Sequence, residues 1–581
     1  MNAVERLIVQ EVRPWRRWVV LGVMGLCASV VLGRAFQLQV IEREFLARES
    51  DKRALRTVKV PAHRGAIRDR RGEPLALSAP VDSVWALPAE LLAAPEYLAP
   101  LAKLLGLSRA ELKKFLTARK DRQFVYLPQA RQIDPDQARH IVSLKAPGVF
   151  AQREYRRFYP AGEISAHLVG FCDIDGRGVE GLEAAQNLAL SGQSGARRVI
   201  RDRQGRVIEE DADIQPAQPG QDLALSMDLR LQYLAYRELK SAVAENRAKG
   251  GLIVVADSHT GEILAMASQP GYNPNRSDER QPGRMRNRAV VDVFEPGSTV
   301  KPLLVAEALE TGLYRPETRI DTGNGEMKIA ASLTVHDSHP RGVVDLGGLL
   351  THSSNVASAK IGLTLGAETV WTAFQKFGLG DPVHSGFPGE ANGVFRNYAE
   401  WGQIATATAS YGYGLSVNAL QLVRAYAAIA NDGLMPPLTL LKRTTPAVAS
   451  RAISQDVARD VRRLMQGVVS VEGTAIKAAV PGYQVSGKTG TVRKISSGGG
   501  YHDDRHQAVF IGLVPSENPR LVGLVMIDEP RNKLYYGGQV AAPVFSRVMK
   551  AAVRLLQVPP SEAPAEPALQ ARAAAPTAPK T

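Results

Sequence analysis

The first strong pattern along the chain is an apolar stretch from Trp18 to Val40, in which Arg34 is the only charged residue. As a helix that rises about 1.5 Å per residue, it can cross a hydrocarbon layer of about 30 Å, with Arg34 near enough to one end to reach the headgroups. Four arginines precede it and favour a cytoplasmic segment 1–17. A cleaved signal peptide is the alternative, but Gly33 to Ala35 form a poor cleavage site. We therefore expect one transmembrane helix over residues 18–40.

The region from 41 to 225 shows sustained periodicity only over Leu101–Ala118, where apolar residues recur at intervals of three and four. This spacing predicts one helix. The rest of the region mixes short apolar runs with turn residues. We therefore expect an elongated α+β domain over 41–225, which we call the pedestal domain.

A second domain is predicted over residues 226–557. Apolar residues that alternate between Gly220 and Asp228 predict a strand, and the period of residues 229–248 predicts a helix. Residues 250–268 then predict two strands joined by a turn rich in Asp, Ser and Gly. Residues 558–581 are rich in Pro and Ala and poor in large apolar residues, so we expect a disordered tail.

Composition and charge narrow the choice of protein class. The chain has 581 residues, more than one domain needs, and its 45% apolar and 22% charged residues are typical of globular proteins. The net charge of +14 favours anionic surroundings, but basic and acidic residues are interspersed and no nucleic-acid-binding motif occurs. We expect no nucleic-acid partner. Cys27 and Cys172 are too few for a disulfide framework and lack metal-ligand neighbours, so we also expect no disulfide and no metal site.

Candidate chemistry begins in residues 294–312, whose pattern predicts a helix with Ser298 in its first turn. Lys301, three residues later, projects from the same helical face. A serine nucleophile needs an adjacent base, and a lysine can act as this base when burial and the positive end of a helix lower its pKa. Backbone N–H groups at such a turn can also hold an oxyanion. Taken alone, the pair fits a capping serine beside a solvated lysine better than a catalytic pair, since Ser-x-x-Lys occurs by chance in a chain of this length.

A second motif is Lys488-Thr489-Gly490, which lies in a strand-like stretch. Alternation along a strand puts Lys488 and Gly490 on the same face. The glycine would let an extended peptide approach the backbone while the lysine meets its terminal carboxylate. The alternative is an ordinary turn that breaks the strand.

A third motif, Ser-x-Asn, occurs three times in the chain. The copies that end at Asn418 and Asn518 are explained by a helix cap and a Pro-flanked loop. The remaining copy, Ser353-Ser354-Asn355, lies between the other two motifs. Ser-x-x-Lys, Ser-x-Asn and Lys-Thr-Gly in this order are the signature set of penicillin-binding proteins and serine β-lactamases.

Over nearly its whole length the chain resembles the class B penicillin-binding proteins, and within them the division-specific type. The segments that carry the resemblance are 61–76, 156–171, 175–183, 406–433, 471–475, 526–530 and 535–545. The segments VGFCDIDGRGVEGLE and YYGGQVAAPVF favour the division type over the elongation type. Val492 and Cys172 depart from the residues common in the family. The resemblance implies a dimerisation-like pedestal domain followed by an antiparallel sheet sandwiched by helices.

The resemblance also implies an activity, a D,D-transpeptidase that cross-links peptidoglycan stem peptides ending in D-Ala-D-Ala at the division septum. It implies that Ser298 attacks the penultimate D-Ala carbonyl and forms an acyl-enzyme while Lys301 takes its proton. It further implies that the backbone N–H groups of Ser298 and Thr491 form the oxyanion hole.

Further roles come from the same resemblance. Ser353 would relay a proton to the departing D-Ala near Lys488, and Asn355 would orient the donor side chain and the catalytic lysine. Lys488 and Thr489, followed by Gly490, would bind the terminal carboxylate. Residues implied around the mouth of the acyl site are Glu295, Tyr535 and Tyr536, and a packing role is the alternative that stays open for each. Neither a metal nor an organic cofactor is implied.

The implied partners are peptidoglycan stem peptides, lipid-linked nascent glycan, β-lactams, the inner membrane and the division glycosyltransferase FtsW with other division proteins. The implied location is the bacterial inner membrane, with the catalytic domain in the periplasm. Two alternatives stay open from the residues alone. One is a D,D-carboxypeptidase or β-lactamase-like hydrolase, since it shares the acyl-enzyme. The other is a non-enzymatic β-lactam receptor or division scaffold.

Overall fold

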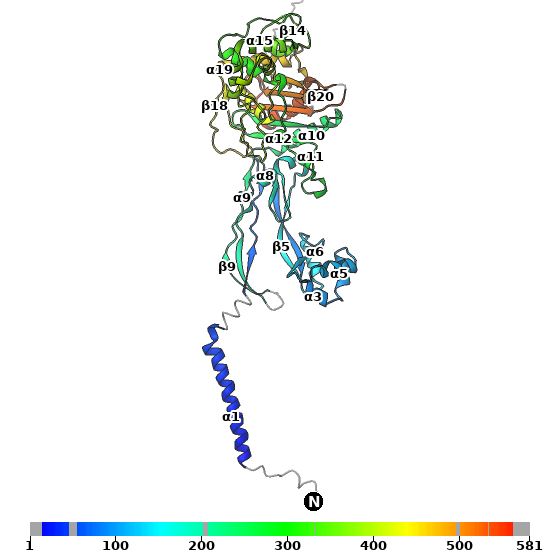
Figure 1. Cartoon of the computed structure of the whole chain (residues 1–581), viewed down its shortest axis with the longest axis vertical. Coiled ribbons are helices and arrows are strands. Elements are labelled where there is room, and N and C mark those ends of the chain that lie inside the picture. The colour runs from blue at the N-terminus through cyan, green and yellow to red at the C-terminus, as the bar shows by residue number, and fades with distance from the viewer. Residues whose placement is uncertain are drawn as a thin grey trace, which may run out of the picture. The chain divides into compact units, whose positions relative to one another are not determined.

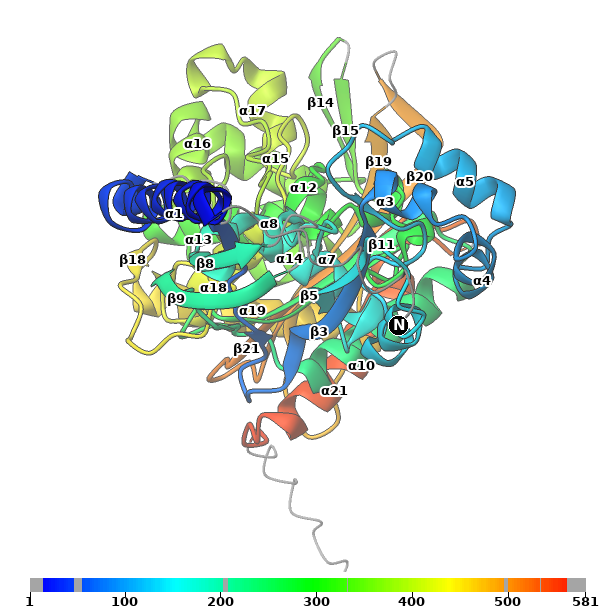
Figure 2. The same cartoon turned by 90° about the horizontal axis from the view of Figure 1, so that it is seen from below.

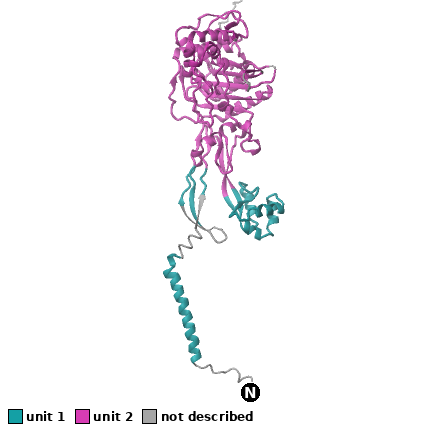
Figure 3. Cartoon of the chain, viewed as in Figure 1, with its two compact units in different colours: residues 1–63, 82–152, 192–219 teal, residues 64–81, 153–191, 220–581 magenta. Residues whose placement is uncertain are grey.

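The computed structural model describes residues 14–45, 55–201, 207–331, 333–495, 500–532 and 534–561 (Figure 1). The predicted cytoplasmic segment and the predicted disordered tail lie almost entirely outside these residues. The chain divides into two compact units that interleave in sequence (Figure 3). The first unit comprises residues 1–63, 82–152 and 192–219, and the second comprises 64–81, 153–191 and 220–581.

The first unit begins with helix α1 (Pro14–Phe36), which continues as a π-helical segment, η2 (Gln37–Ile41). From Trp15 to Ile41 this helix is long and apolar enough to cross a membrane, and its most apolar window is not buried against other described residues. A helix thus lies where the transmembrane helix is predicted over 18–40, and it fits a single-pass membrane anchor.

The first unit also contains an antiparallel sheet and a group of helices. The sheet has the strand order β1 (Leu55–Val60), β8 (Gly195–Arg201) and β9 (Val207–Gln215). The helices of the group are α3 (Pro88–Ala93), α4 (Leu98–Leu104), α5 (Arg109–Thr117) and α6 (Pro135–Val142). They share one apolar core with the end of β3 (Pro74–Ala86), with β4 (Val125–Tyr126) and with the start of β5 (Val149–Phe158).

The single helix predicted over Leu101–Ala118 is wrong, because this stretch contains the end of α4 and the whole of α5. Gly106 adopts a left-handed conformation between them, with a φ of +68°. The side chain of Ser108 then caps the start of α5. Both helices bury leucines in the same core, so the apolar spacing continues across the break and periodicity alone does not reveal it.

The centre of the second unit is a five-stranded antiparallel sheet with the strand order β12-β11-β21-β20-β19. The strands are β11 (Gly250–Asp257), β12 (Ile263–Gln269), β19 (Ser486–Ile495), β20 (Tyr501–Val514) and β21 (Leu521–Asp528). Every residue of β11 and β21 is buried, which requires cover on both faces of the sheet. At one end of the order, β19 is an edge strand.

Helices supply this cover. Helix α10 (Leu229–Glu245) and helix α21 (Ala542–Leu555) contact each other and the sheet (Figure 2). Helix α18 (Ala419–Ala430) contacts β11, β20 and β21. The predicted α+β architecture, with an antiparallel sheet between helices, is confirmed, and α10 and the β11–β12 hairpin lie where they are predicted.

The strand predicted between Gly220 and Asp228 is shorter than expected. Only β10 (Leu223–Ala224) is a strand, and it pairs in parallel with β2 (Ile67–Arg68). Leu225 forms a single bridge to another segment, and the residues that follow it are buried. The apolar alternation here therefore reflects burial more than strand pairing.

A buried charge cluster joins three segments of the second unit. Glu183, in α8 (Gly181–Ala185), pairs at 2.6 Å with Arg64 and at 2.6 Å with Arg157, and its side chain is 0% exposed. The thiol of Cys172 donates a hydrogen bond of 3.2 Å to the same carboxylate, and burial raises the pKa of this thiol. A cysteine thus supplies a polar contact at one position where the sequence departs from the family that it resembles.

We expect Glu183→Gln to lower the free energy of unfolding by about 3 kcal/mol, because two buried guanidinium groups lose their shared counter-charge. Urea unfolding of the full chain in detergent measures this loss. Glu163→Gln is the matched control, since it removes an exposed pair with Lys240 and should change the same free energy by less than about 0.5 kcal/mol. Equal losses in the two variants would contradict a special role for the buried carboxylate.

Candidate active site

Ser298 lies in a 3₁₀ turn, η5 (Gly297–Val300), that leads directly into helix α13 (Lys301–Glu310). The predicted position at the start of a helix is correct, with a 3₁₀ turn in place of the first α-helical turn. A side chain added at Gly297 would lie 2.6 Å from the Val492 side chain of β19. The glycine therefore allows the edge strand to approach the turn that carries the serine.

Lys301 is completely buried and is surrounded by oxygen atoms. Its Nζ lies 2.7 Å from the Ser353 carbonyl, 3.2 Å from Ser353 Oγ and 2.8 Å from Asn355 Oδ1. Burial lowers the pKa of Lys301 well below its usual value, and the charge of Lys488 lowers it further. The carboxylate of Asp337 acts in the opposite direction. The arrangement favours a neutral amine, which can accept a proton.

The Ser-Ser-Asn segment forms the junction between helix α14 (Leu346–His352) and helix α15 (Asn355–Leu365). Ser353 has a φ of +58°, in the left-handed region that non-glycine residues rarely adopt. Its carbonyl and hydroxyl both face the Lys301 amine. Ser354 caps α15 with its side chain. The strained turn thus brings two side chains of the motif to the lysine.

The Lys-Thr-Gly motif lies in β19, as predicted. Lys488 is fully buried, its Nζ lies 3.0 Å from Ser353 Oγ, and burial lowers its pKa to about 7. The Thr489 hydroxyl lies 3.0 Å from that of Thr474. A side chain at Gly490 would lie 3.0 Å from Thr299 Cγ2, so glycine fits the close approach to η5.

Thr491 lies on the same edge strand, next to the Ser298 turn. Its hydroxyl accepts a hydrogen bond of 3.1 Å from the Gly537 backbone N–H. Because the outer side of β19 has no partner strand within the described chain, it can hydrogen-bond an extended peptide.

Asp337 completes this arrangement, and sequence reasoning missed it. Its Oδ1 accepts hydrogen bonds from the backbone N–H groups of Asn355 at 2.5 Å and Val356 at 3.0 Å. Its Oδ2 accepts one from the Ser354 hydroxyl at 2.6 Å. The carboxylate therefore holds the start of α15 and places a negative charge near Lys301. It lies outside the three motifs and acts mainly on backbone groups, so no residue pattern indicates it.

We expect Asp337→Asn to shift the rising limb of the pH–acylation profile to lower pH, because losing the carboxylate charge lowers the pKa of Lys301 further. We also expect the plateau rate to fall by about tenfold, since the Ser-Ser-Asn turn is held less well. Rates of acylation by a chromogenic cephalosporin across the pH range measure both effects. Asp345→Asn, which alters an exposed cap at the start of α14, is the matched control. An unshifted profile would contradict the electrostatic role of Asp337.

Glu295 lies three residues before the serine and is buried. Its Oε1 accepts hydrogen bonds from the Gly414 backbone N–H at 2.8 Å and from the Tyr501 hydroxyl at 3.1 Å. Burial raises the pKa of this carboxyl. Glu295 thus connects the residue segment just before the serine turn with β20 and with the loop at Gly414.

Tyr535 and Tyr536 form a stack with His506. The ring centroids lie 4.3 Å apart for His506 and Tyr535, and 4.5 Å apart for the two tyrosines. Tyr536 is exposed and precedes α20 (Gly537–Val540), whose first N–H donates to Thr491. The stack is therefore connected to the end of the Lys-Thr-Gly-Thr segment.

The structure brings four of the five predicted catalytic residues into one hydrogen-bonded group, consisting of Lys301, Ser353, Asn355 and Lys488. The Ser298 hydroxyl makes no hydrogen bond to this group within the described chain, although its turn adjoins it. Among the described residues, no group of three or more His, Cys, Asp or Glu side chains is placed to hold a metal ion.

Comparison with known proteins agrees with this geometry. The family model "Penicillin binding protein transpeptidase domain" matches residues 251–550, and "Penicillin-binding Protein dimerisation domain" matches residues 59–225. The probable peptidoglycan D,D-transpeptidase PbpC of Pseudomonas aeruginosa is 39% identical over 560 residues, which cover 96% of this chain and 98% of the relative. The peptidoglycan D,D-transpeptidase FtsI of Escherichia coli K12 is 39% identical over 556 residues, covering 94% and 92%.

A solved structure, the TP domain of penicillin-binding protein 3 from Burkholderia pseudomallei, is 41% identical to this chain with a TM-score of 0.54. It covers 58% of this chain, and 98% of that structure is matched. The chain belongs to the class B penicillin-binding proteins, which combine a dimerisation domain with a transpeptidase domain. The predicted resemblance to the division-specific type, known as FtsI or penicillin-binding protein 3, is confirmed by these relatives.

Proposed function

We propose that this chain is a serine-type peptidoglycan D,D-transpeptidase that cross-links stem peptides at the division septum through an acyl-enzyme on Ser298. The observation that carries the proposal is the environment of Lys301. Its amine is buried, its pKa is lowered, and it begins the helix that directly follows the Ser298 turn. A lysine in this state can activate the serine hydroxyl, which a solvated lysine cannot do at neutral pH.

In the first step, Ser298 Oγ attacks the penultimate D-Ala carbonyl while Lys301 Nζ takes the hydroxyl proton. The negative charge that develops on the carbonyl oxygen is stabilised by the backbone N–H groups of Ser298 and Thr491. The C–N bond to the terminal D-Ala then breaks, and the leaving amine receives a proton through Ser353. Ser353 Oγ suits this relay because it lies between the two lysine amines, 3.2 Å from Lys301 and 3.0 Å from Lys488.

In the second step, an amine of a neighbouring stem peptide attacks the ester carbonyl and releases Ser298. Asn355 orients the donor peptide and Lys301. Before the first step, Lys488 and Thr489 bind the terminal carboxylate of the donor, which later leaves with D-Ala, and Gly490 leaves room for the donor backbone on the edge of β19. We place three further residues at the mouth of the site, Glu295, Tyr535 and Tyr536.

We further propose that the amino terminus lies in the cytoplasm and that the catalytic unit lies in the periplasm. The arginines before the apolar helix support this orientation. Helix α1 and the first unit are then the parts expected to contact the division glycosyltransferase FtsW. Crosslinking from single cysteines introduced into α1 measures this contact, and labelling of residues after α1 from the periplasmic side measures the orientation.

The function is tested by mixing the full chain in detergent with a penicillin and following its intact mass over hours. We expect a one-to-one adduct that persists, and peptide mapping should place it on Ser298. With a stem peptide and an acceptor amine, the enzyme should release D-Ala and form the amide-linked product.

Two other results would each reject part of this proposal. Rapid loss of the adduct with turnover of the drug would indicate a hydrolase, because water would then deacylate the serine. A persistent adduct without any D-Ala release or cross-linked product from stem peptides would indicate a β-lactam receptor.

A further inference from the structure

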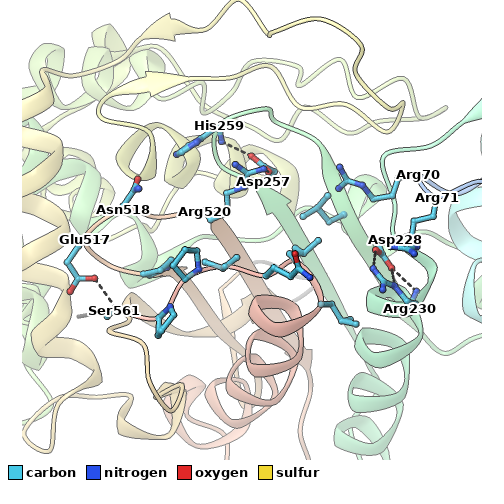
Figure 4. Close-up of a pocket in the computed structure, with 18 residues that line it drawn as sticks. Arg70, Arg71, Asp228, Arg230, Asp257, His259, Glu517, Asn518, Arg520 and Ser561 are labelled. Atoms are coloured by element: carbon cyan, nitrogen blue, oxygen red, sulfur yellow. Dashed lines mark hydrogen bonds and ion pairs between the residues drawn. The ribbon is translucent and has the colours of Figure 1, made fainter. Parts of the chain in front are cut away.

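A large cavity lies in the second unit and shares no residue with the site around Ser298 (Figure 4). Its volume is about 1460 Å³, above the range of about 300–1,000 Å³ that is typical of small-molecule sites. Five separate segments form its walls. They are the turn after β2, the start of α10, the turn between β11 and β12, the loop between β20 and β21, and the segment that follows α21.

The cavity is lined by apolar side chains, which we call its floor, and by charged side chains. Apolar side chains in its lining include Leu264, Pro515, Leu556 and Val558. Four arginines from three of the segments also line it, and Figure 4 shows Arg70, Arg71 and Arg230 grouped at one end. A surface that binds a peptide or a protein usually combines apolar and polar side chains in this way.

Three of these arginines are held in place by buried carboxylates. Arg230 pairs with Asp228 at 2.6 Å, and the exposed fractions of the two side chains are 42% and 2%. Arg520 pairs with Asp257 at 2.8 Å, with exposed fractions of 49% and 3%. In both pairs the carboxylate lies beneath and the guanidinium faces the cavity.

Arg70 follows the same pattern, since it pairs at 3.3 Å with the buried Glu262. Arg71 is exposed, and its guanidinium makes no hydrogen bond or ion pair within the described part of the chain. The lining therefore holds four arginines beside Asp228, Asp257 and Glu517. Within the Arg230 and Arg520 pairs the guanidinium is the more exposed group, and the Arg71 guanidinium has no carboxylate partner within the described residues. Because the guanidinium groups are already oriented, little ordering is needed when an anionic ligand binds.

The wall after α21 is also fixed. The Tyr483 hydroxyl donates to the Val558 carbonyl at 2.7 Å, and the Gln484 backbone N–H donates to Ser561 Oγ at 3.0 Å. Ser561 Oγ in turn donates to Glu517 at 3.1 Å. A smaller cavity of about 340 Å³ shares His259, Glu517 and Asn518 with the large one, so the recess continues beyond it.

We propose that this recess binds an extended acidic peptide segment of another protein. Apolar side chains of the peptide lie on the floor of the cavity. The carboxylates of the peptide pair with Arg71 and with the exposed N–H groups of Arg70, Arg230 and Arg520. An inorganic anion or a lipid headgroup would use the arginines but not the apolar floor or the length of the recess. The site is separate from the catalytic residues, so the proposal does not depend on the function proposed for Ser298.

The test uses the full chain in detergent and a fluorescein-labelled peptide of alternating leucine and glutamate residues, with binding followed by fluorescence anisotropy. A second peptide carries glutamine in place of each glutamate. We expect the glutamate peptide to bind at least about tenfold more tightly than the glutamine peptide, and its affinity to fall as salt rises. Arg71→Glu should weaken its binding by at least about tenfold.

Arg396→Glu is the matched control, because it makes the same charge change at an exposed arginine outside the cavity and should leave binding unchanged. Penicillin acylation at the wild-type rate shows that each variant is folded, and Arg71→Gln replaces Arg71→Glu if that variant fails this check. Equal affinity for the two peptides, or equal loss in the Arg71 and Arg396 variants, would overturn the proposal. So would complete displacement of the peptide by millimolar inorganic phosphate or by phosphatidylglycerol vesicles, since the site would then recognise an isolated anion or a lipid surface.

Discussion

Replacing Ser298 by alanine is expected to abolish acylation by penicillin and release of D-Ala, with a fall in rate of about 10⁵-fold or more. The loss is this large because the ester that links the two half-reactions forms on the Ser298 hydroxyl. The Ser298 hydroxyl makes no hydrogen bond to the surrounding polar group within the described chain, so its removal should change the free energy of unfolding by less than about 0.5 kcal/mol. A chemical defect without a folding defect is the expected signature of the nucleophile.

Intact mass after exposure to penicillin and a thermal unfolding curve measure the two quantities on one preparation. Ser241→Ala serves as the matched control, since this serine is exposed on α10 and its hydroxyl donates a hydrogen bond to Glu245. An adduct that still forms on the Ser298 variant would move the nucleophile to another residue. A large loss of stability would mean that the hydroxyl has a structural role.

The candidate catalytic residues could be selected from the sequence because each belongs to a short motif and the three motifs occur in a fixed order. Their contacts could not be predicted in the same way. Lys301 reaches Ser353 only because the chain adopts a left-handed conformation at a serine, where no glycine marks the turn. Asp337 was missed for a related reason, since it binds backbone N–H groups whose positions depend on the fold of α14 and α15.

Tertiary packing also explains the other differences. The two helices α4 and α5 share one core, so their apolar spacing resembles that of one helix. The arginine-lined recess could not be predicted from the sequence, because Arg70, Arg230 and Arg520 are far apart in the chain. Two of their carboxylate partners also lie on distant segments, since Arg70 pairs with Glu262 and Arg520 pairs with Asp257. Local patterns predict elements and motifs well, whereas contacts between distant segments follow from the three-dimensional structure.

Replacing Lys301 by methionine is expected to lower the rate of acylation by roughly 10³-fold, which lies within the range for loss of a general base. Methionine keeps the unbranched, buried side chain but cannot accept a proton. In the wild type, the acylation rate should rise with pH as the lysine loses its proton, and the lowered pKa of Lys301 places this rise well below that of a solvated lysine. The Lys301→Met variant should lack this rise, because methionine has no proton to lose.

Lys301→Arg distinguishes a base from a positive charge that merely stabilises the transition state. Arginine stays protonated at all relevant pH values, so it can supply charge but cannot take the serine proton. If the lysine acts as the base, the arginine variant should be about as slow as the methionine variant. Lys488 is a useful comparison, because its proposed role is to bind a carboxylate and contact Ser353 while it is charged. Lys488→Arg should therefore retain a higher rate of acylation than Lys301→Arg when both are measured with the same cephalosporin. The reverse order of rates would exchange the roles assigned to the two lysines.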